Sequence, residues 1–324
     1  MLKIPNGDKT IFESEYRIMD IIKEYQTTGK IDIHLNFEGP SCEELSLYYY
    51  LDQICKLFDI DKSLITIRTC NELEQHSDYN IVQAKNPWYN MKYVPDDTQV
   101  GLNQDARYIG LFVGRSSWVR LWFLGWLDPA RSLITSHLDR TNEFQISFIG
   151  SSLDNMIQHQ ASTQDITNSL KFLDHGPIVL DPIDSYPILS PTHLNLLKIY
   201  NQFFVELVCE TYFSGKTFFP TEKTFRPIIG LKPFITHASP GYLTELKKRD
   251  YQTFNKWWSE EYDLYGDEAR LHKMQDVLRE ILSWSPEKLH QVYSEMMPVL
   301  EHNRKNYFAK NRSQKGKDLD AKTN

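Results

Sequence analysis

Apolar and polar positions along the first hundred residues predict helices that alternate with strands. Residues 11–28 repeat apolar side chains at helical spacing, and Gly29 follows as a helix stop. Residues 31–37 alternate between apolar and polar side chains, which is typical of a half-buried strand. A second helix is predicted at 42–58 and a second strand at 64–68. This α-β-α-β order is typical of a parallel sheet flanked by helices.

The same pattern resumes in the second half of the chain, after a stretch that lacks periodicity. Residues 84–106 contain prolines, glycine and polar residues, and we interpret them as a connection or lid. Residues 150–190 give no clear prediction. Beyond residue 106, the predicted strands are 108–113, 146–149, 203–209 and 234–237. The predicted helices are 118–127, 193–202, one opening near Thr221, one from Pro240, 267–284 and 286–309.

These elements predict an α/β fold of two Rossmann-like halves with mostly parallel sheets, divided near residue 105. The predicted domains are 1–105 and 106–310, and residues 311–324 are expected to form a disordered tail because they are polar and highly charged. Within the first half, Ser41 and Glu44 have the spacing of a capping box, which predicts that a helix begins near residue 42. In parallel sheets of this kind, ligands bind beyond the carboxyl ends of the strands, so the loops there are the candidate sites.

Charge and cysteine content narrow the classes of function. The formal net charge is −7 and the pI is about 5.8, so a polyanion could bind only in a local basic groove. The four cysteines lack metal-binding spacing, which favours free thiols and a reducing compartment. The apolar stretch at residues 121–127 is too short to span a bilayer. We expect a cytoplasmic protein without membrane insertion, with no leader sequence at its start.

One candidate loop follows the strand at 203–209. Glu210 ends that strand, and Thr221 then opens a helix with Glu222 and Lys223 in its first turn, followed by Arg226. A carboxylate here could bind ribose hydroxyls, and the cations and helix amides could hold a diphosphate. The alternative is structural, because Thr-Glu is a common helix start and the cations could be solvated.

This segment resembles the donor half of the fucosyltransferase-type GT-B glycosyltransferases. Their pattern is a strand ending in Glu, a Thr-Glu-Lys helix start, a small and apolar run, and a Pro-apolar strand. This chain matches with Glu210, Thr221 to Lys223, Ile228 to Leu231 and Pro233 to Ile235.

The chain is also similar to a group of uncharacterised glycosyltransferase-like proteins of phages and giant viruses. Their EKTxRP block is followed by KPFI, a Ser-Pro-Gly turn and a TF…YD stretch. The matching residues here are Lys232 to Ile235, Ser239 to Gly241, Thr253-Phe254 and Tyr262-Asp263. The resemblance covers roughly residues 107–285, and the EKT block is its most specific part.

The resemblance implies a glycosyltransferase that takes a sugar from a nucleotide-sugar donor, with inversion as the preferred outcome. Residues 106–310 would bind the donor and residues 1–105 the acceptor, and the last helix could cross back to the first domain. The viral likeness implies that the acceptor is a glycan or a hydroxymethylated base of phage DNA, and that the protein acts in the host cytoplasm.

A second loop follows the strand at 108–113. Gly114 permits close approach of a ligand to the backbone, and Arg115 and Ser116 stand at a helix N-terminus with Arg120 one turn further on. The family has a Ser-Asn turn and a downstream Arg at the diphosphate, so the Gly-Arg-Ser sequence here departs from its pattern. The alternative is that the two arginines pair with Asp128 or Asp139.

A third loop belongs to the first domain. Glu38 follows the strand at 31–37, and we interpret it as the general base that takes the proton from an acceptor hydroxyl. His76 and Glu74, after the second strand, are the reserve candidates. The alternative is that Glu38 caps the following helix or binds backbone amides in the Gly-Pro turn.

The sequence has no pair of acidic residues at the end of a predicted strand, where a metal-nucleotide complex is usually bound. The acidic pairs Asp96-Asp97 and Asp181 with Asp184 lie among turn residues, so we expect a metal-independent reaction without a cofactor. Two alternatives stay open: a non-catalytic module that binds a nucleotide or glycan, and an α/β nucleotide-binding enzyme of different chemistry.

Overall fold

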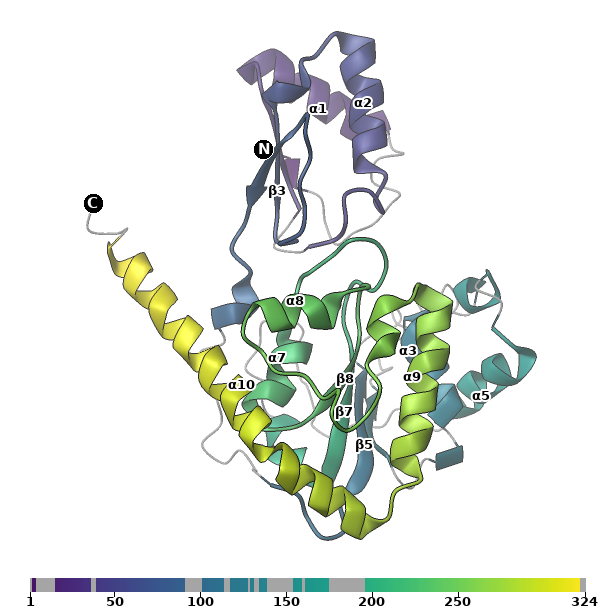
Figure 1. Ribbon diagram of the computed structural model, residues 1–324. Coiled ribbons are helices and arrows are strands. Elements are labelled where there is room, and N and C mark those ends of the chain that lie inside the picture. The colour runs from purple at the N-terminus through teal and green to yellow at the C-terminus, as the bar shows by residue number, and fades with distance from the viewer. Residues whose placement is uncertain are drawn as a thin grey trace.

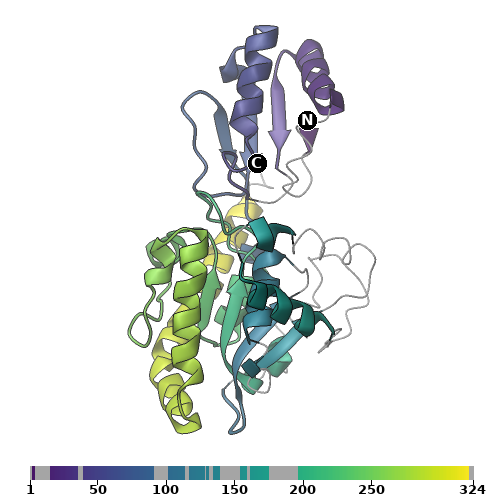
Figure 2. The same cartoon turned by 90° about the vertical axis from the view of Figure 1, so that its right-hand side faces the viewer.

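The protein folds into two lobes, one above the other (Figure 1). The computed structural model describes residues 2–3, 15–35, 39–90, 101–113, 117–127, 129–130, 134–138, 154–158, 161–174 and 196–320. Described strands up to residue 83 build the upper lobe, and strands from residue 107 onwards build the lower lobe. Figure 2 shows the lobes meeting at a narrow junction.

The upper lobe is a parallel sheet covered by two helices. Its strands follow the order of the sequence, and every neighbouring pair is parallel. The strands are β1 (Leu2–Lys3), β2 (Ile31–His34), β3 (Ile65–Thr69) and β4 (Asn80–Gln83). The helices are α1 (Glu15–Thr28) and α2 (Leu47–Phe58), with the short 3-10 turn η2 (Lys62–Leu64). The 3-10 turn η3 (Pro87–Asn90) follows β4 and packs against the lower lobe. Gly29, with φ 70°, ends α1 as the sequence predicts.

The two faces of the upper sheet differ in polarity. Ile31 and Ile33 of β2 are buried in one apolar cluster with residues of α1 and α2. The alternate positions face away from the helices and are only half-buried. Among them, Arg68 donates to Asp32 over 2.9 Å between the Nε and Oδ1 atoms. The alternation that predicts a half-buried strand is therefore confirmed, and the helices cover one face.

The lower lobe is a second parallel sheet, with the strand order β6-β5-β7-β8. The strands are β5 (Arg107–Val113), β6 (Ile134–Leu138), β7 (Phe203–Cys209) and β8 (Phe234–His237). Because the chain leaves β5 towards β6 on one side and continues from β7 towards β8 on the other, the strand order reverses between β5 and β7. Such a reversal is the position at which open α/β sheets bind ligands, beyond the carboxyl ends of the strands.

Helices cover both faces of the lower sheet. The helices and 3-10 turns are α3 (Trp118–Leu127), α5 (Thr163–Asp174), η5 (Leu196–Gln202), α7 (Glu222–Ile229), α8 (Tyr242–Lys248), η6 (Glu261–Leu264), α9 (Asp267–Leu282) and α10 (Pro286–Asp320). Figure 1 shows α7 and α10 on one side of the strands and α3 and α9 on the other. The α3 and α9 helices touch through Trp122 and His272, whose ring centroids are 5.5 Å apart. The buried side chains of this lobe form one large apolar cluster.

Three buried elements occupy the predicted positions, because α3, β7 and β8 have the predicted boundaries. The helix near Thr221 is also confirmed, because Thr221 is the N-cap of α7 and accepts from the Lys223 amide. The α/β class with parallel sheets is likewise confirmed. The predicted strand at 146–149 lies outside the described residues.

Other boundaries differ from the prediction for local reasons. The second helix begins at Leu47 instead of 42, because Ser46 adopts a left-handed conformation with φ 55°. Ser41 still accepts from the Glu44 amide at 3.5 Å, but residues 42–46 form turns. The predicted helix at 193–202 is the 3-10 turn η5. The strand β6 and the helix α5 were not predicted.

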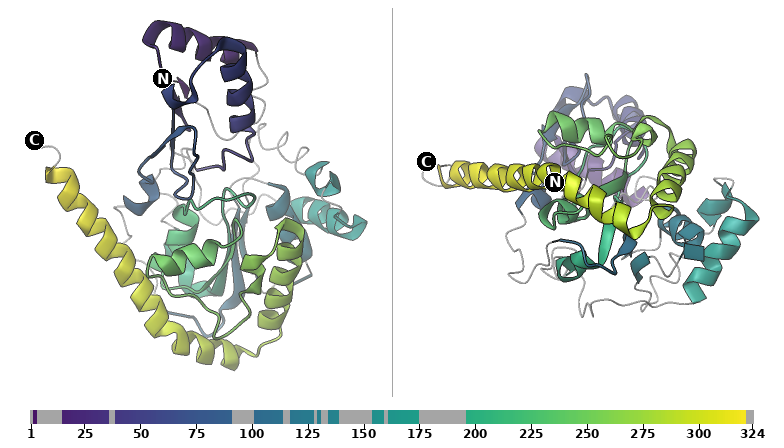
Figure 3. Two further views of the ribbon diagram at one scale, coloured as in Figure 1. Left: turned by 45° about the horizontal axis from the view of Figure 1, so that its top comes forward. Right: turned by 60° about the horizontal axis from the view of Figure 1, so that its bottom comes forward.

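The last helix continues beyond its predicted end. α10 extends to Asp320, through most of the segment for which the sequence predicts disorder. It projects beyond the lower lobe (Figure 3), and Tyr307 donates to the Trp88 carbonyl of η3 over 3.3 Å. Packing of the buried face of α10, up to Tyr307, stabilises a formed helix. The charged residues that follow extend this helix without having to nucleate it.

Candidate functional site

The carboxyl ends of the two sheets face each other across the junction between the lobes. Asn71, which follows β3, donates from Nδ2 to the Lys216 carbonyl over 3.0 Å and accepts at Oδ1 from the Phe218 amide over 2.9 Å. The amide of Glu72 donates to the Phe218 carbonyl over 3.1 Å. Because the segment 211–220 follows β7, these bonds join the carboxyl ends of β3 and β7.

Further contacts hold the same junction. Arg249, at the end of α8, forms an ion pair with Glu72 at 2.7 Å. The Asn86 side chain donates to the Pro220 carbonyl over 2.8 Å. Gly39 packs so tightly that a Cβ atom there would lie 2.7 Å from the Cβ of Phe219. Loops of both lobes therefore line one shared region.

Arg120 lies at the strand-order reversal of the lower sheet. Its guanidinium donates to the Cys209 carbonyl over 3.1 Å, which links the first turns of α3 to the end of β7. The residue is 9% exposed. Gly114, Arg115 and Ser116, the other predicted residues of this loop, lie outside the described residues. A buried cation therefore stands where the sheet topology places a ligand.

Glu210 lies at the end of β7, as predicted, but protein donors surround its carboxylate. It accepts from the Thr221 amide at 3.1 Å, from the Thr221 hydroxyl at 2.6 Å and from the Thr224 hydroxyl at 2.6 Å. The Tyr242 hydroxyl adds a fourth bond at 3.3 Å. These contacts place a negative charge at the N-terminus of α7, where the helix dipole stabilises it.

Lys223 is more accessible than Arg120 and Arg226. Its side chain is 19% exposed, and its ammonium lies 3.1 Å from Oε1 of Glu222. The same nitrogen donates to the hydroxyls of Thr211 and Thr221, each over 3.2 Å. Thr221, Glu222 and Lys223 therefore form a polar cluster with Glu210 at the edge of the sheet, and the ammonium can reach a ligand in solvent.

Arg226 belongs to α7 and points away from this cluster, towards Glu206 of β7. Its guanidinium lies 2.5 Å from Oε1 of Glu206 and donates to the Tyr200 hydroxyl over 2.7 Å, and Tyr200 also donates to Glu206. Burial lowers the pKa of Arg226, but Glu206, Tyr200 and Glu222 together raise it above the usual value, so the group stays charged. The structure thus gives Arg226 the contacts of a core ion pair, and the sheet separates this pair from the α3 side.

The acceptor-side candidates occupy the upper lobe. Glu38 lies outside the described residues. His76 packs against the rings of Tyr48 and Tyr79, at centroid distances of 4.2 and 4.9 Å, and its Nδ1 accepts from the Asp78 amide. Its hydrogen-bond and ring contacts within the described part of the chain are all in the upper lobe.

Glu74, the other reserve base, is engaged on both carboxylate oxygens. It accepts from the Tyr48 hydroxyl at 2.7 Å, from the Cys42 amide at 3.0 Å and from the Asn71 side chain at 3.2 Å. Asn71 connects it in turn to the segment 216–218 of the lower lobe. Glu74 therefore orients the residue that joins the two carboxyl edges.

Sequence reasoning missed one residue at this edge. His237 ends β8 and is fully buried, and neither ring nitrogen has a hydrogen-bond partner among the described residues. Burial, with Arg270 and Arg120 nearby, holds its pKa well below the usual range. Its position in the sequence could have indicated it, because His237 ends a predicted strand and Glu210, which was a candidate, directly follows one.

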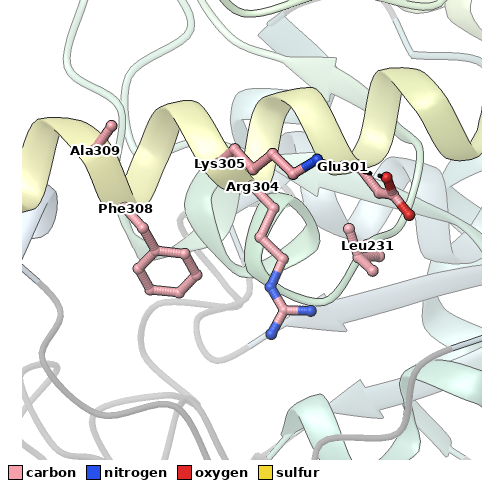
Figure 4. A pocket seen from close by; sticks show the side chains of 6 residues that line it. All are labelled: Leu231, Glu301, Arg304, Lys305, Phe308 and Ala309. Atoms are coloured by element: carbon pink, nitrogen blue, oxygen red, sulfur yellow. Dashed lines mark ion pairs between the residues drawn. The ribbon is translucent and has the colours of Figure 1, made fainter.

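A cavity of about 450 Å³ lies elsewhere, along α10. Figure 4 shows Arg304 and Phe308 pointing to the side of α10 on which Leu231 lies. Leu231 precedes β8, so the cavity opens near the amino end of that strand. Since parallel sheets bind ligands beyond their carboxyl ends, we place the candidate site at the edge formed by Arg120 and Lys223.

Comparison with known proteins adds no family to this description. No protein-family model matches the chain, and a search of curated proteins finds no match. Among the described residues, no helix has the length and apolar composition needed to cross a membrane, and no three His, Cys, Asp or Glu side chains gather as metal ligands. The geometry itself describes the chain: two parallel α/β lobes whose carboxyl edges meet around a cluster of charged side chains.

Proposed function

We propose that the protein is a glycosyltransferase of the GT-B type that takes its sugar from a nucleotide-activated donor. One observation carries the proposal: the carboxyl edges of two parallel α/β sheets face each other, joined by the bonds of Asn71 to the segment 216–218. Such an arrangement offers one edge to a donor and the other to an acceptor. The resemblance of the Thr221 to Lys223 segment to fucosyltransferase-type enzymes supports the same function.

The lower lobe would bind the donor. Lys223 and Arg120 supply positive charge at the reversal of strand order, and both can stabilise the diphosphate as it leaves. Glu222, held 3.1 Å from Lys223, would orient that ammonium. With positive charge from side chains, we propose a transfer that needs no metal ion.

The upper lobe would bind the acceptor. A base there takes the proton from the acceptor hydroxyl, the oxygen forms a bond to the anomeric carbon, and the bond from that carbon to the phosphate oxygen breaks. The nucleoside diphosphate leaves with the bonding electrons, and one displacement inverts the configuration. Glu38 and His76 are the proposed bases.

Nucleotide binding can be measured by thermal shift with GDP-, UDP-, ADP-, CMP- and dTDP-sugars, each with and without EDTA. A ligand at a hundred times its Kd adds about 2.7 kcal/mol of stability, which raises Tm visibly. We expect one nucleotide family to shift Tm irrespective of EDTA. The shift should vanish in Lys223→Ala and persist in Lys248→Ala, which removes an ammonium from an exposed side chain of α8.

Turnover separates an enzyme from a binding module. With the donor that shifts Tm, release of the nucleoside diphosphate in the presence of candidate glycans or hydroxymethylated DNA measures transfer. Binding without transfer or hydrolysis would favour the non-catalytic module. No shift with any nucleotide sugar would contradict the proposed donor site.

A further inference from the structure

The imidazole of His237 occupies an aromatic enclosure at the carboxyl end of β8. Its ring centroid lies 5.0 Å from that of Phe213 and 6.0 Å from that of Phe123 on α3. His237 is in register with Cys209 of β7, and its carbonyl accepts from the Glu210 amide over 2.9 Å. The side chain therefore lies on the α3 side of the sheet, at the edge that holds the candidate site.

Both ring nitrogens are buried without a hydrogen-bond partner in the described part of the chain. Burial of a polar group without such a partner costs stability, and native proteins contain few of these groups. An apolar side chain would fill the same space without this cost. The unpaired nitrogens therefore point to a partner that binds from outside the chain.

The surroundings define the chemistry of that partner. Arg270 donates to the carbonyls of Phe213 and Ala238, and Arg120 donates to that of Cys209. Burial, together with these two guanidinium groups, lowers the pKa of His237 and disfavours an imidazolium, so the ring is neutral. A neutral imidazole offers one N–H donor and one lone pair, a pattern that suits hydroxyl groups.

Phe213 packs against the imidazole in this structure, and the upper lobe holds the segment that contains Phe213. The neighbouring Gly215, with φ 66°, packs against Glu44, and the Lys216 carbonyl accepts from Asn71. A change in the contact between the lobes would therefore move the segment that covers His237. Access to the imidazole is coupled to the position of the upper lobe.

We propose that His237 binds hydroxyl groups of the donor sugar, donating to one oxygen and accepting from a neighbouring hydroxyl, once Phe213 has moved aside. The inference rests on the proposed function, since it assigns the sugar subsite of the same edge. Lys223 and Arg120 bind the diphosphate, and His237 distinguishes a nucleotide sugar from a nucleoside diphosphate.

The test compares two dissociation constants in three proteins by calorimetry. The ligands are the nucleotide sugar found by thermal shift and its nucleoside diphosphate. In His237→Phe, which keeps a ring and removes both nitrogens, the Kd of the nucleotide sugar should rise about two- to tenfold, as expected for one or two hydrogen bonds. The Kd of the nucleoside diphosphate should stay within about twofold of wild type on the same reasoning. His237→Gln keeps a donor and an acceptor and should recover part of the loss.

A second measurement uses the unaltered protein and does not depend on the variants folding. The nitrogen shifts of the His237 ring, assigned by NMR, should change with the nucleotide sugar and much less with the nucleoside diphosphate. Equal changes in the nitrogen shifts with the two ligands would overturn the role of His237 and leave the proposed function standing. So would a ratio of the two Kd values that is the same in both variants as in wild type. If wild type binds no nucleotide of the panel, the proposed function itself fails and this inference with it.

Discussion

At the scale of the residue, two of the cations that the lower lobe buries, Arg226 and Lys232, have different kinds of partner. Arg226 pairs with Glu206, whereas the partners of Lys232 within the described structure are a carbonyl and two aromatic rings. The Lys232 ammonium donates to the Gly101 carbonyl over 2.7 Å and lies 4.4 Å from the ring centroid of Tyr293. A paired charge and one without a carboxylate respond differently to substitution and to pH.

Replacement of Arg226 by Met should strongly destabilise the protein. It leaves the Glu206 carboxylate buried without its cation, a loss of about 3–5 kcal/mol in the free energy of unfolding. The matched control is Arg279→Met, which breaks an exposed pair with Asp276 and should cost less than about 1 kcal/mol. Urea denaturation measures both. Similar losses in the two variants would contradict the core role of Arg226.

Lys232 should make stability depend on pH in the alkaline range. Burial lowers its pKa to about 7, while the unfolded chain has the usual value near 10.4. Between these values the unfolded state binds more protons, so the free energy of unfolding rises with pH. In Lys232→Met the free energy of unfolding should rise less steeply with pH. The variant should exceed wild type in stability most near pH 7, and the difference should shrink towards pH 10. If the free energy of unfolding depends on pH in the same way in wild type and Lys232→Met, the prediction is wrong.

At the scale of the element, the start of α7 depends on a single carboxylate. Glu210 accepts four hydrogen bonds from Thr221, Thr224 and Tyr242, so it holds the helix against the end of β7. The Thr221 N-cap indicates the helix start, as the sequence predicts. The partners of Glu210 come from α7 and α8, and their meeting depends on the packing of those helices.

Glu210→Gln should lower stability, because an amide cannot accept at both positions. We expect a loss of about 2–3 kcal/mol, as for a hydrogen-bonded charged group. Glu287→Gln, at the exposed first turn of α10, should change stability by less than about 0.5 kcal/mol. If Glu210 instead binds the donor, the variant will lose nucleotide affinity at unchanged stability.

The start of α2 gives another prediction. Ser46 has φ 55°, a conformation that glycine adopts at no steric cost. Ser46→Gly should therefore raise the free energy of unfolding by about 0.5–1 kcal/mol. Ser63, in η2, has no positive φ, so Ser63→Gly should give no gain. Equal effects in the two variants, measured by thermal unfolding, would show that the backbone of Ser46 carries no strain.

Continuous apolar runs were the part of the fold that sequence reasoning predicted best. α3 and β7 are apolar and buried almost throughout, so their composition alone marks them. β8 is a shorter buried strand that ends in Thr236 and His237. The start of α2 could not be predicted, because it depends on one backbone angle at Ser46. Within the site, the position of Lys223 followed from its helix start. The pairing of Arg226 joins residues 20 positions apart, and the unpaired nitrogens of His237 depend on what packs around them.

At the scale of the whole molecule, close packing at Gly39 controls how the lobes meet. A Cβ there would lie 2.7 Å from Phe219 and 2.8 Å from the Asn71 backbone nitrogen. Gly39→Ala should therefore weaken the contact and speed hydrogen exchange at the amides of Glu72 and Phe218, which bond across the junction. Gly266→Ala places its Cβ in open space and should leave these amides unchanged. Equal exchange in both variants would contradict a tight junction.

The path of α10 has a consequence for the order in which the chain can fold during synthesis. The upper lobe takes its core from residues before 82, so it can become compact while the remainder is still on the ribosome. The core of the lower lobe includes Tyr293, Met296 and Tyr307 of α10. The core of the lower lobe therefore cannot be completed until α10 has left the ribosome, and part of the apolar surface of its strands stays uncovered until then. We expect a nascent chain halted near residue 285 to resist protease in its upper lobe and to be cleaved throughout the lower one.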